Sequence, residues 1–208
     1  MSLWGRVFAA GYDRFTAGAE RAGLAQRRHA LLEPLRGRVI EIGGGTGANL
    51  EHYPPGLEEL IITEPEPPMA RRLKQRVHAS ALPARVVQAP AEHLPFPDNS
   101  FDFAVSTLVL CTVDDPVQAL SELHRVLRPG GELVFIEHVR ASSPRLARWQ
   151  DRLHPLWVRF GHGCHCNRAT VENIRAAGFD VRRIEHGALA KAPAIVRPLV
   201  VGSAAVAA

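Results

Sequence analysis

The strongest chemical signal in the sequence is a glycine cluster that directly follows a short apolar run at residues 38–42. Its members are Gly43, Gly44, Gly45 and Gly47. Glycine at such a strand-to-helix turn lets the backbone approach a ligand where any Cβ would collide. The pattern therefore predicts a turn that holds a ligand by its main chain.

Two glutamates flank this turn and narrow the choice of ligand. Glu64 ends the β-rich run at residues 60–63, where a carboxylate can accept hydrogen bonds from a ribose diol. It follows the first glycine by about 20 residues, as in dinucleotide sites. Glu41 stands just before the glycines, where it would repel a pyrophosphate but not a cationic ligand.

Three interpretations of the turn remain open on these residues alone. Gly43, Gly45 and Ala48 also satisfy the looser dinucleotide pattern G-x-G-x-x-G/A. A cationic ligand is favoured by Glu41 and by the open alternation of glycines, and a purely structural turn is the third possibility.

The elements that must position these residues alternate along the chain. Short β-rich runs occur at residues 38–42, 60–63, 85–88, 101–106 and 132–139, and a closing strand pair is expected at 179–185 and 199–206. Helix-period runs begin at Pro67, after Asp114 or Asp115, and at about Thr170. The second carries Leu120, Leu123 and Leu127 on one face and should stop at Gly130 and Gly131. This alternation predicts an α/β fold with a doubly wound, mostly parallel seven-stranded sheet and an antiparallel C-terminal strand.

Composition excludes several other classes of protein. The 208 residues include 25 Lys+Arg and 21 Asp+Glu, a net charge of +4, and the cations are scattered rather than clustered as in a nucleic-acid-binding module. Three cysteines cannot form a disulfide framework, which favours the cytoplasm. The apolar tail at residues 192–208 is too short and interrupted to cross a membrane, so a buried strand is expected there.

Four sequence blocks together resemble the class I S-adenosylmethionine-dependent methyltransferases. The blocks are residues 39–47, residues 62–65 with Met69, residues 91–102 and residues 127–131. Their order and spacing agree over residues 36–139, half of the chain. The resemblance implies a Rossmann-like methyltransferase fold with S-adenosylmethionine as cofactor. It divides one domain, residues 1–208, into an N-terminal helical cap (1–35), a cofactor-binding core (36–139), a substrate-side insertion (140–178) and a C-terminal strand pair (179–208).

The resemblance also implies a role for particular residues. The glycines would pass beside the methionine and ribose of the cofactor, with Glu41 behind them, and Glu64 would hold the ribose hydroxyls. The remaining expected cofactor contacts are Pro65 and Met69 at the adenine face, Ala91 and Glu92 at its edge, Thr107 and Leu108 at the methionine end, and Tyr12 folding over the cofactor or packing as a plain helix residue. Pro90 stands where the family usually has an aspartate, which leaves Glu92 as the candidate replacement.

The acceptor is a small molecule if the chain follows the branch that includes thiol S-methyltransferase-like proteins. The segment 135–139, Gly163-Cys164 and residues 177–179 resemble that branch. In-line displacement needs alignment above all, and a thiol needs little further help, whereas an amine, a phenol or a lipid-like acceptor would profit from a base. His138, at the end of the fifth strand, is the candidate base, with a structural role as the alternative.

Other functions stay open beside this one. An NAD-dependent oxidoreductase would use the same fold, and a non-catalytic S-adenosylmethionine-binding protein would use the same site. A metal site in the cluster at residues 162–166 is disfavoured because structural zinc sites pair two ligand couples across a loop; a substrate-facing loop or the start of a helix suits it better. A nucleic-acid partner is not expected, since no base-flipping motif is present, and the oligomeric state is undetermined.

Overall fold

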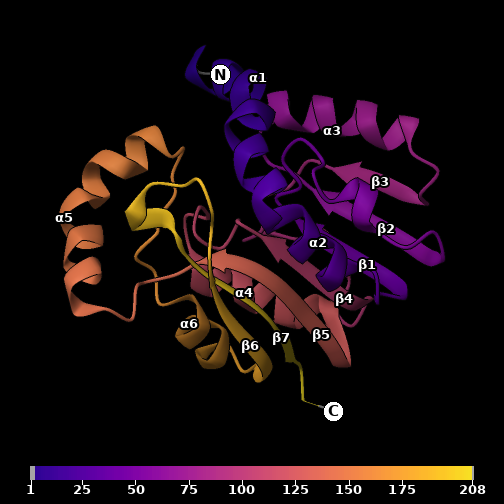
Figure 1. Cartoon of the computed structure of the whole chain (residues 1–208). Coiled ribbons are helices and arrows are strands. Elements are labelled where there is room, and N and C mark those ends of the chain that lie inside the picture. The colour runs from indigo at the N-terminus through magenta and orange to yellow at the C-terminus, as the bar shows by residue number, and fades with distance from the viewer. Residues whose placement is uncertain (1–2, 208) are drawn as a thin grey trace.

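A mixed seven-stranded sheet forms the centre of the molecule, with strand order β3-β2-β1-β4-β5-β7-β6 (Figure 1). This computed structural model describes residues 3–207, and side chains from residue 11 onward. The strands are β1 (Gly37–Ile42), β2 (Leu57–Thr63), β3 (Ala84–Val87), β4 (Phe101–Thr107), β5 (Leu127–His138), β6 (Asp180–Ala188) and β7 (Pro198–Ala205). The pairs among β1 to β5 are parallel, and β7 is antiparallel to β5 and β6. The fold class and the antiparallel C-terminal strand are confirmed.

Helices cover both faces of this sheet. They are α1 (Leu3–Ala19), a π-helical turn η1 (Glu20–Leu24), α2 (Ala25–Leu32), α3 (Pro67–Ala79), α4 (Pro116–Val126), α5 (Pro144–Phe160) and α6 (Thr170–Ala176), with 3-10 turns η2 (Leu50–His52) and η3 (Ala194–Val196). Leu32 of α2 and Leu73 of α3 pack on Val39 and Ile62 of the sheet. Leu120 of α4 and Ile174 of α6 pack on the opposite face, against residues such as Ile40 and Phe135. No helix among the described residues is both long and apolar enough to cross a bilayer.

The parallel strands decide where a ligand can bind. The carboxyl ends of β1, β2, β4 and β5 lie at one edge of the sheet, so the loops that follow Ile42, Thr63, Thr107 and His138 meet there. In Figure 1 the N-terminal helix α1 lies at this edge, near α3.

Three details differ from the expectations. The helix at residues 116–126 ends before Leu127, which begins β5 and pairs with Phe101; Pro129 disfavours helical backbone at the residue before it. The glycine turn leads into turns and η2 rather than a regular helix, because Gly43, Gly45 and Gly47 all have positive φ. Residues 144–160 form a 17-residue helix, where no helix was expected.

Candidate functional site

The glycine turn after β1 is held tightly on one side and open on the other. A Cβ on Gly44 would overlap the side chain of Ile62, and a Cβ on Gly43 would lie 2.7 Å from Val109. Gly45 differs, because its φ is 57° and its added Cβ would have nothing nearer than the Gly43 carbonyl oxygen at 4.0 Å. The turn therefore presents bare backbone to open space at Gly45.

Glu64 lies beside this turn and is joined to it. One carboxylate oxygen accepts the N–H of Gly45 at 2.8 Å, and the other accepts the N–H of Glu66 at 2.9 Å. The side chain is largely buried, and this burial raises the pKa of Glu64 above its ordinary value. A carboxylate offers about four acceptor positions, so about two remain for the hydroxyls of a ligand.

Glu41 lies deeper, beneath the turn. Its carboxylate accepts hydrogen bonds from Asn49 at 2.9 Å and from the Tyr53 hydroxyl at 2.7 Å, and burial raises the pKa of Glu41. Gly44 covers it, since a Cβ there would lie 3.7 Å from a Glu41 oxygen. Both Glu41 oxygens thus have protein partners.

A buried arginine connects this carboxylate network to the loop after β4. Arg28 of α2 donates to Asn49 at 2.7 Å and to the Thr107 hydroxyl at 2.9 Å, and it forms an ion pair with Glu20. Arg28, Asn49 and Tyr53 were not among the site residues expected from the sequence. Only the position of Asn49 shortly after the glycines could have drawn attention to one of them.

The loop after β4 is shaped by Glu137, the residue before His138. Its carboxylate accepts the hydroxyl of Ser106 at 2.7 Å and the backbone N–H groups of Val109, Leu110 and Cys111 at 3.0, 3.1 and 3.4 Å. Burial raises the pKa of Glu137. Leu108 lies within this loop with a φ of 61°, and its N–H donates to the carbonyl of Ile136. The expected contacts Thr107, which ends β4, and Leu108, in the loop after it, are therefore held in place from below.

The N-terminal helix α1 is attached to the glycine turn. The Thr46 hydroxyl donates to Asp13 at 2.6 Å, and Arg76 donates to the Thr46 carbonyl at 3.0 Å. Tyr12, which precedes Asp13 in α1, lies close enough to Arg28 and Glu64 to interact with their charges. Burial raises the pKa of Tyr12 to about 12. The structure therefore places Tyr12 beside the turn, as a group that stays protonated at neutral pH.

The residues expected around adenine follow β2 and β3 at the same edge. Met69 and Ala91 are buried, and Pro65 is exposed just after Glu64. Glu92 is already engaged, because one oxygen accepts the N–H groups of Asp114 and Asp115 at 2.8 and 3.2 Å. These bonds hold the start of α4 and make Glu92 a weak replacement for the aspartate that Pro90 lacks.

His138 lies at the end of β5, two strands away from β1. It is 8% exposed, and its Nδ1 has no hydrogen-bond partner among the described residues. Burial lowers the pKa of His138 to about 4, against a smaller opposite effect of the Pro198 and Val196 carbonyls. The ring is neutral at physiological pH and would be a weak base.

The cysteine cluster lies behind the loop after β4. Cys111, Cys164 and Cys166 are buried with Ile195 and Val196, and the Cys111 and Cys164 sulfurs are 3.7 Å apart. His165 faces His154 instead, at 2.8 Å between ring nitrogens. In the part of the chain that the structure describes, His, Cys, Asp and Glu side chains form no group of three suited to a metal ion.

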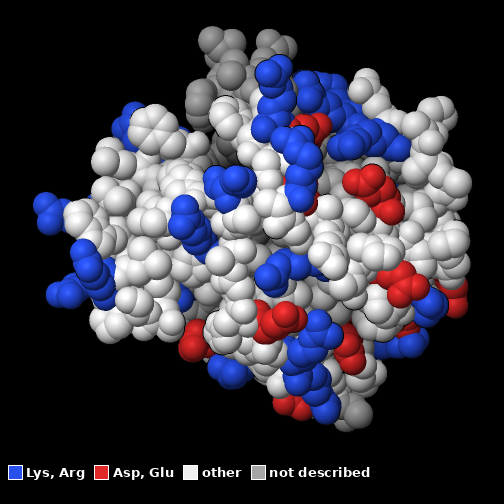
Figure 2. Space-filling model, in the orientation of Figure 1, with Lys and Arg blue, Asp and Glu red and all other residues white. Residues whose placement is uncertain are grey.

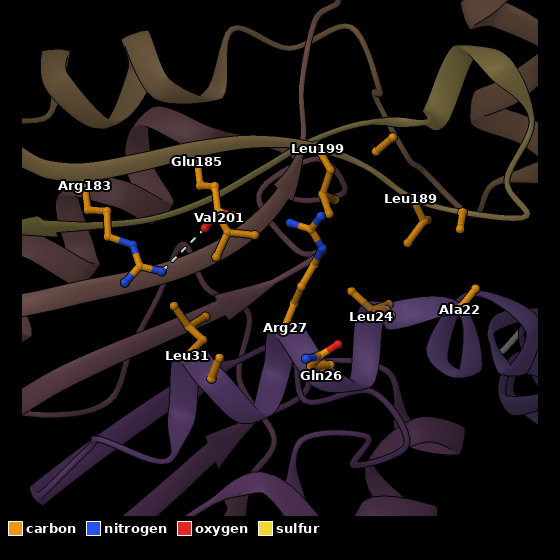
Figure 3. A pocket seen from close by; sticks show the side chains of 14 residues that line it. Ala22, Leu24, Gln26, Arg27, Leu31, Arg183, Glu185, Leu189, Leu199 and Val201 are labelled. Carbon is orange, nitrogen blue, oxygen red and sulfur yellow. Dashed lines mark ion pairs between the residues drawn. The ribbon is translucent and has the colours of Figure 1, made fainter.

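A cavity lies beside the glycine site rather than in it. Its volume is about 420 Å³, and it separates η1 and α2 from β6 and β7 (Figure 3). Leu24, Leu31, Leu199 and Val201 line it, while Arg183 and Glu185 form an ion pair at its rim. The same leucines belong to an apolar cluster that includes Leu108, so the cavity adjoins the loop after β4.

The residues at the turn fit an adenosyl group with a positively charged sulfonium. The bare backbone at Gly45, the spare acceptor positions on Glu64 and the buried carboxylate of Glu41 suit a ribose and a cation. A sheet of this order, with such a turn after β1 and a carboxylate after β2, defines a Rossmann-like methyltransferase domain.

Comparison with known proteins agrees with this class. A family model described as "Methyltransferase domain" matches residues 40–135. Thiol S-methyltransferase TMT1A of Homo sapiens is 35% identical over 170 residues, which cover 80% of this chain and 69% of the human protein. The chain belongs to the class I S-adenosylmethionine-dependent methyltransferases. This membership decides against the NAD-dependent interpretation of the glycine turn.

Two further relatives extend the comparison. Thiol S-methyltransferase TMT1B of Rattus norvegicus is 38% identical over 153 residues, 71% of this chain, and the matched region spans 62% of the rat protein. A crystal structure described as an S-adenosylmethionine-dependent methyltransferase, possibly a histamine N-methyltransferase, from Thermotoga maritima has a TM-score of 0.70 at 27% identity. It covers 96% of this chain and 97% of that one.

Proposed function

We propose that this chain transfers the methyl group of S-adenosylmethionine to a small thiol carried on an apolar skeleton. The observation that supports this most is the open backbone at Gly45 joined to the Glu64 carboxylate. When bound, S-adenosylmethionine supplies an activated methyl group on a sulfonium. The protein then has to hold the cofactor, align the acceptor and exclude water.

The expected site residues other than Glu92 and His138 have a part in this proposal. Glu64 binds the ribose hydroxyls, Gly43 to Gly47 line the ribose and methionine, and Pro65, Met69 and Ala91 border the adenine. Glu41 attracts the sulfonium from beneath the turn, without direct contact, because it is 2% exposed and lies under Gly44. Thr107, Leu108 and Tyr12 enclose the methionine end.

The weak basicity of His138 favours a thiol over an amine or a phenol as the acceptor. General-base catalysis works best when the pKa of the base is near the working pH, and His138 has a pKa of about 4. A thiol, with a pKa of about 8.5, supplies some thiolate unaided. The thiol proton would pass to solvent first. The acceptor thiolate would then form the bond to the methyl carbon as the bond from that carbon to the sulfonium breaks, and the demethylated cofactor would leave as a neutral thioether. The names of the two thiol S-methyltransferase relatives support the same acceptor class.

We place the apolar part of the acceptor in the cavity between α2 and β6–β7. This cavity adjoins Leu108 through a shared cluster of leucines, so an acceptor lodged there could present its sulfur at the loop after β4. We also propose a cytoplasmic location, which rests on the three cysteines that cannot make a disulfide framework.

The test is a methyl-transfer assay with labelled S-adenosylmethionine and a panel of thiols, amines and phenols. We expect label in thiols, with apolar thiols preferred over 2-mercaptoethanol. Ala30→Trp, which fills the cavity from an exposed position on α2, should raise KM for the bulky thiols only. His29→Trp, an exposed neighbour outside the cavity lining, is the matched control. Tight cofactor binding without transfer to any acceptor would favour the non-catalytic alternative.

A further inference from the structure

Helix α5 presents an unusual outer face. Large apolar side chains project from it into solvent: Trp149 is 47% exposed, Leu156 59% and Phe160 69%. At 3.6 residues per turn these positions fall within about 40° of one another around the helix axis. Exposed apolar residues are normal when scattered singly, whereas these three form one continuous row.

Arginines flank this row along the same helix. Arg145, Arg148, Arg152 and Arg159 are exposed and fall in a band about 60° wide beside the apolar stripe. Arg152 lies over the Trp149 ring, with its guanidinium carbon 5.8 Å from the ring centroid. In Figure 2, Lys and Arg groups project from the left edge, where Figure 1 places α5, without an acidic group among them.

The acidic side chain of α5 is already paired with an arginine outside the helix. Asp151 is the single acidic residue of the helix. It forms a bidentate ion pair with Arg140 at 2.6 and 2.7 Å and accepts a hydrogen bond from Asn167 at 3.0 Å. The outer face is therefore cationic and apolar at once.

The adjoining face of α5 is fixed against the protein, so the row cannot turn inward. Gln150 is fully buried, and its amide nitrogen donates to the carbonyls of Val139, Cys166 and Ile195 at 2.9 to 3.1 Å. Its side-chain oxygen accepts the N–H of Ala141 at 2.8 Å. These four bonds fix the rotation of the helix and hold Trp149 and Phe160 toward solvent.

We propose that this face of α5 docks the protein on an anionic bilayer surface. A helix with arginines beside tryptophan, phenylalanine and leucine lies in the interfacial plane, with its apolar row in the acyl boundary and its cations at the anionic headgroups. The positive charge of this face favours an anionic bilayer over a neutral one. The proposal does not depend on the methyl-transfer reaction.

Cosedimentation of the full chain with vesicles tests this directly. We expect binding to phosphatidylcholine vesicles that contain phosphatidylglycerol, weakening as salt is raised, and little binding to phosphatidylcholine alone. Trp149 emission should shift to the blue on binding, and Trp149→Phe should remove that shift. Absent binding of the unaltered chain, or equal binding to both vesicle types, would overturn the proposal.

Matched variants separate this face from the overall charge. Each arginine near an anionic surface contributes about fivefold, so Arg148→Gln with Arg152→Gln should weaken partitioning about 25-fold. Arg71→Gln with Lys74→Gln, on the exposed side of α3, changes the net charge equally and should have little effect. A similar loss from both pairs would contradict a specific role for α5.

A second control addresses the apolar row. Leu156→Ala with Phe160→Ala should abolish vesicle binding, whereas Val117→Ala, which removes an equally exposed side chain from α4 (66%), should not. Sedimentation equilibrium of the same proteins tests whether a second copy of the chain binds this face instead. Self-association that depends on Leu156 and Phe160, without vesicle binding, would assign the face to a second copy of the chain and refute the membrane proposal.

Discussion

Replacing Glu64 by alanine should remove most of the affinity for S-adenosylmethionine. The carboxylate is 5% exposed and has about two acceptor positions left beyond its bonds to Gly45 and Glu66. Hydrogen bonds to a charged group contribute about 1.5–3 kcal/mol each. Two ribose hydroxyls therefore account for about 3–6 kcal/mol, which corresponds to a Kd raised about 100-fold to 10,000-fold.

Isothermal titration calorimetry on the purified chain measures this change. Glu66→Ala is the matched control, because its side chain is exposed and Glu66 contacts Glu64 through its backbone N–H, which the variant keeps. Thermal melting of both variants separates lost binding from lost folding. An unchanged Kd in a folded Glu64→Ala protein would refute the placement of the ribose.

The same site predicts a pH dependence of binding. Burial raises the pKa of Glu64 in the free protein, and hydroxyl donors favour the ionised form. Binding should therefore release protons, and affinity should rise as the pH rises through the raised pKa and level off above it. Glu64→Gln should abolish this rise. An unchanged dependence of affinity on pH in that variant would show that the released proton comes from another group.

Two further predictions concern the turn and the end of β5. Gly45→Ala should fold, losing about 1–2 kcal/mol to its left-handed backbone, yet bind the cofactor about tenfold more weakly because its methyl group projects into the open side. Gly44→Ala should instead lower the melting temperature, because its Cβ overlaps Ile62; the reversed pattern would contradict the assigned open side. The pKa of His138 falls from the ordinary 6.5 to about 4 on folding. As the pH falls, the unfolded chain therefore takes up this proton before the folded chain does. About 3 kcal/mol of the free energy of unfolding should be lost as the pH falls from 6.5 to about 4. Denaturant titrations at a series of pH values should show that His138→Gln lacks this loss. An equal dependence of the unfolding free energy on pH in both proteins would refute the shift in pKa.

The sequence predicted the parts of the site that neighbouring residues determine. The glycines, Glu64 and the strands that precede them are marked by local patterns, since a strand, a turn and a carboxylate follow one another along the chain. The C-terminal strand followed from an apolar tail too short to span a membrane, and β7 confirms it.

The network around Arg28 could not be predicted in this way. Its guanidinium meets Thr107, which lies 79 residues further along the chain, and nothing near Arg28 in the sequence marks it as buried. Helix α5 was missed for a different reason. Its apolar residues do repeat on one side, but Pro155 lies inside it, and an interior proline argues against a regular helix.

Buried carboxylates near the ends of three strands explain how the site holds its shape. Loops that follow parallel strands begin with backbone N–H groups that lack sheet partners, and a buried donor must be satisfied. Glu137 accepts three such N–H groups and the Ser106 hydroxyl, so its capacity is used within the protein. Glu41 accepts only side-chain donors beneath the turn. Glu64 alone among these three accepts one N–H on each oxygen at the open side of the turn. The unused acceptor positions of Glu41 lie beneath Gly44, whereas those of Glu64 lie at the open side of the turn. We therefore expect Glu64, rather than Glu41 or Glu137, to bind the ligand hydroxyls.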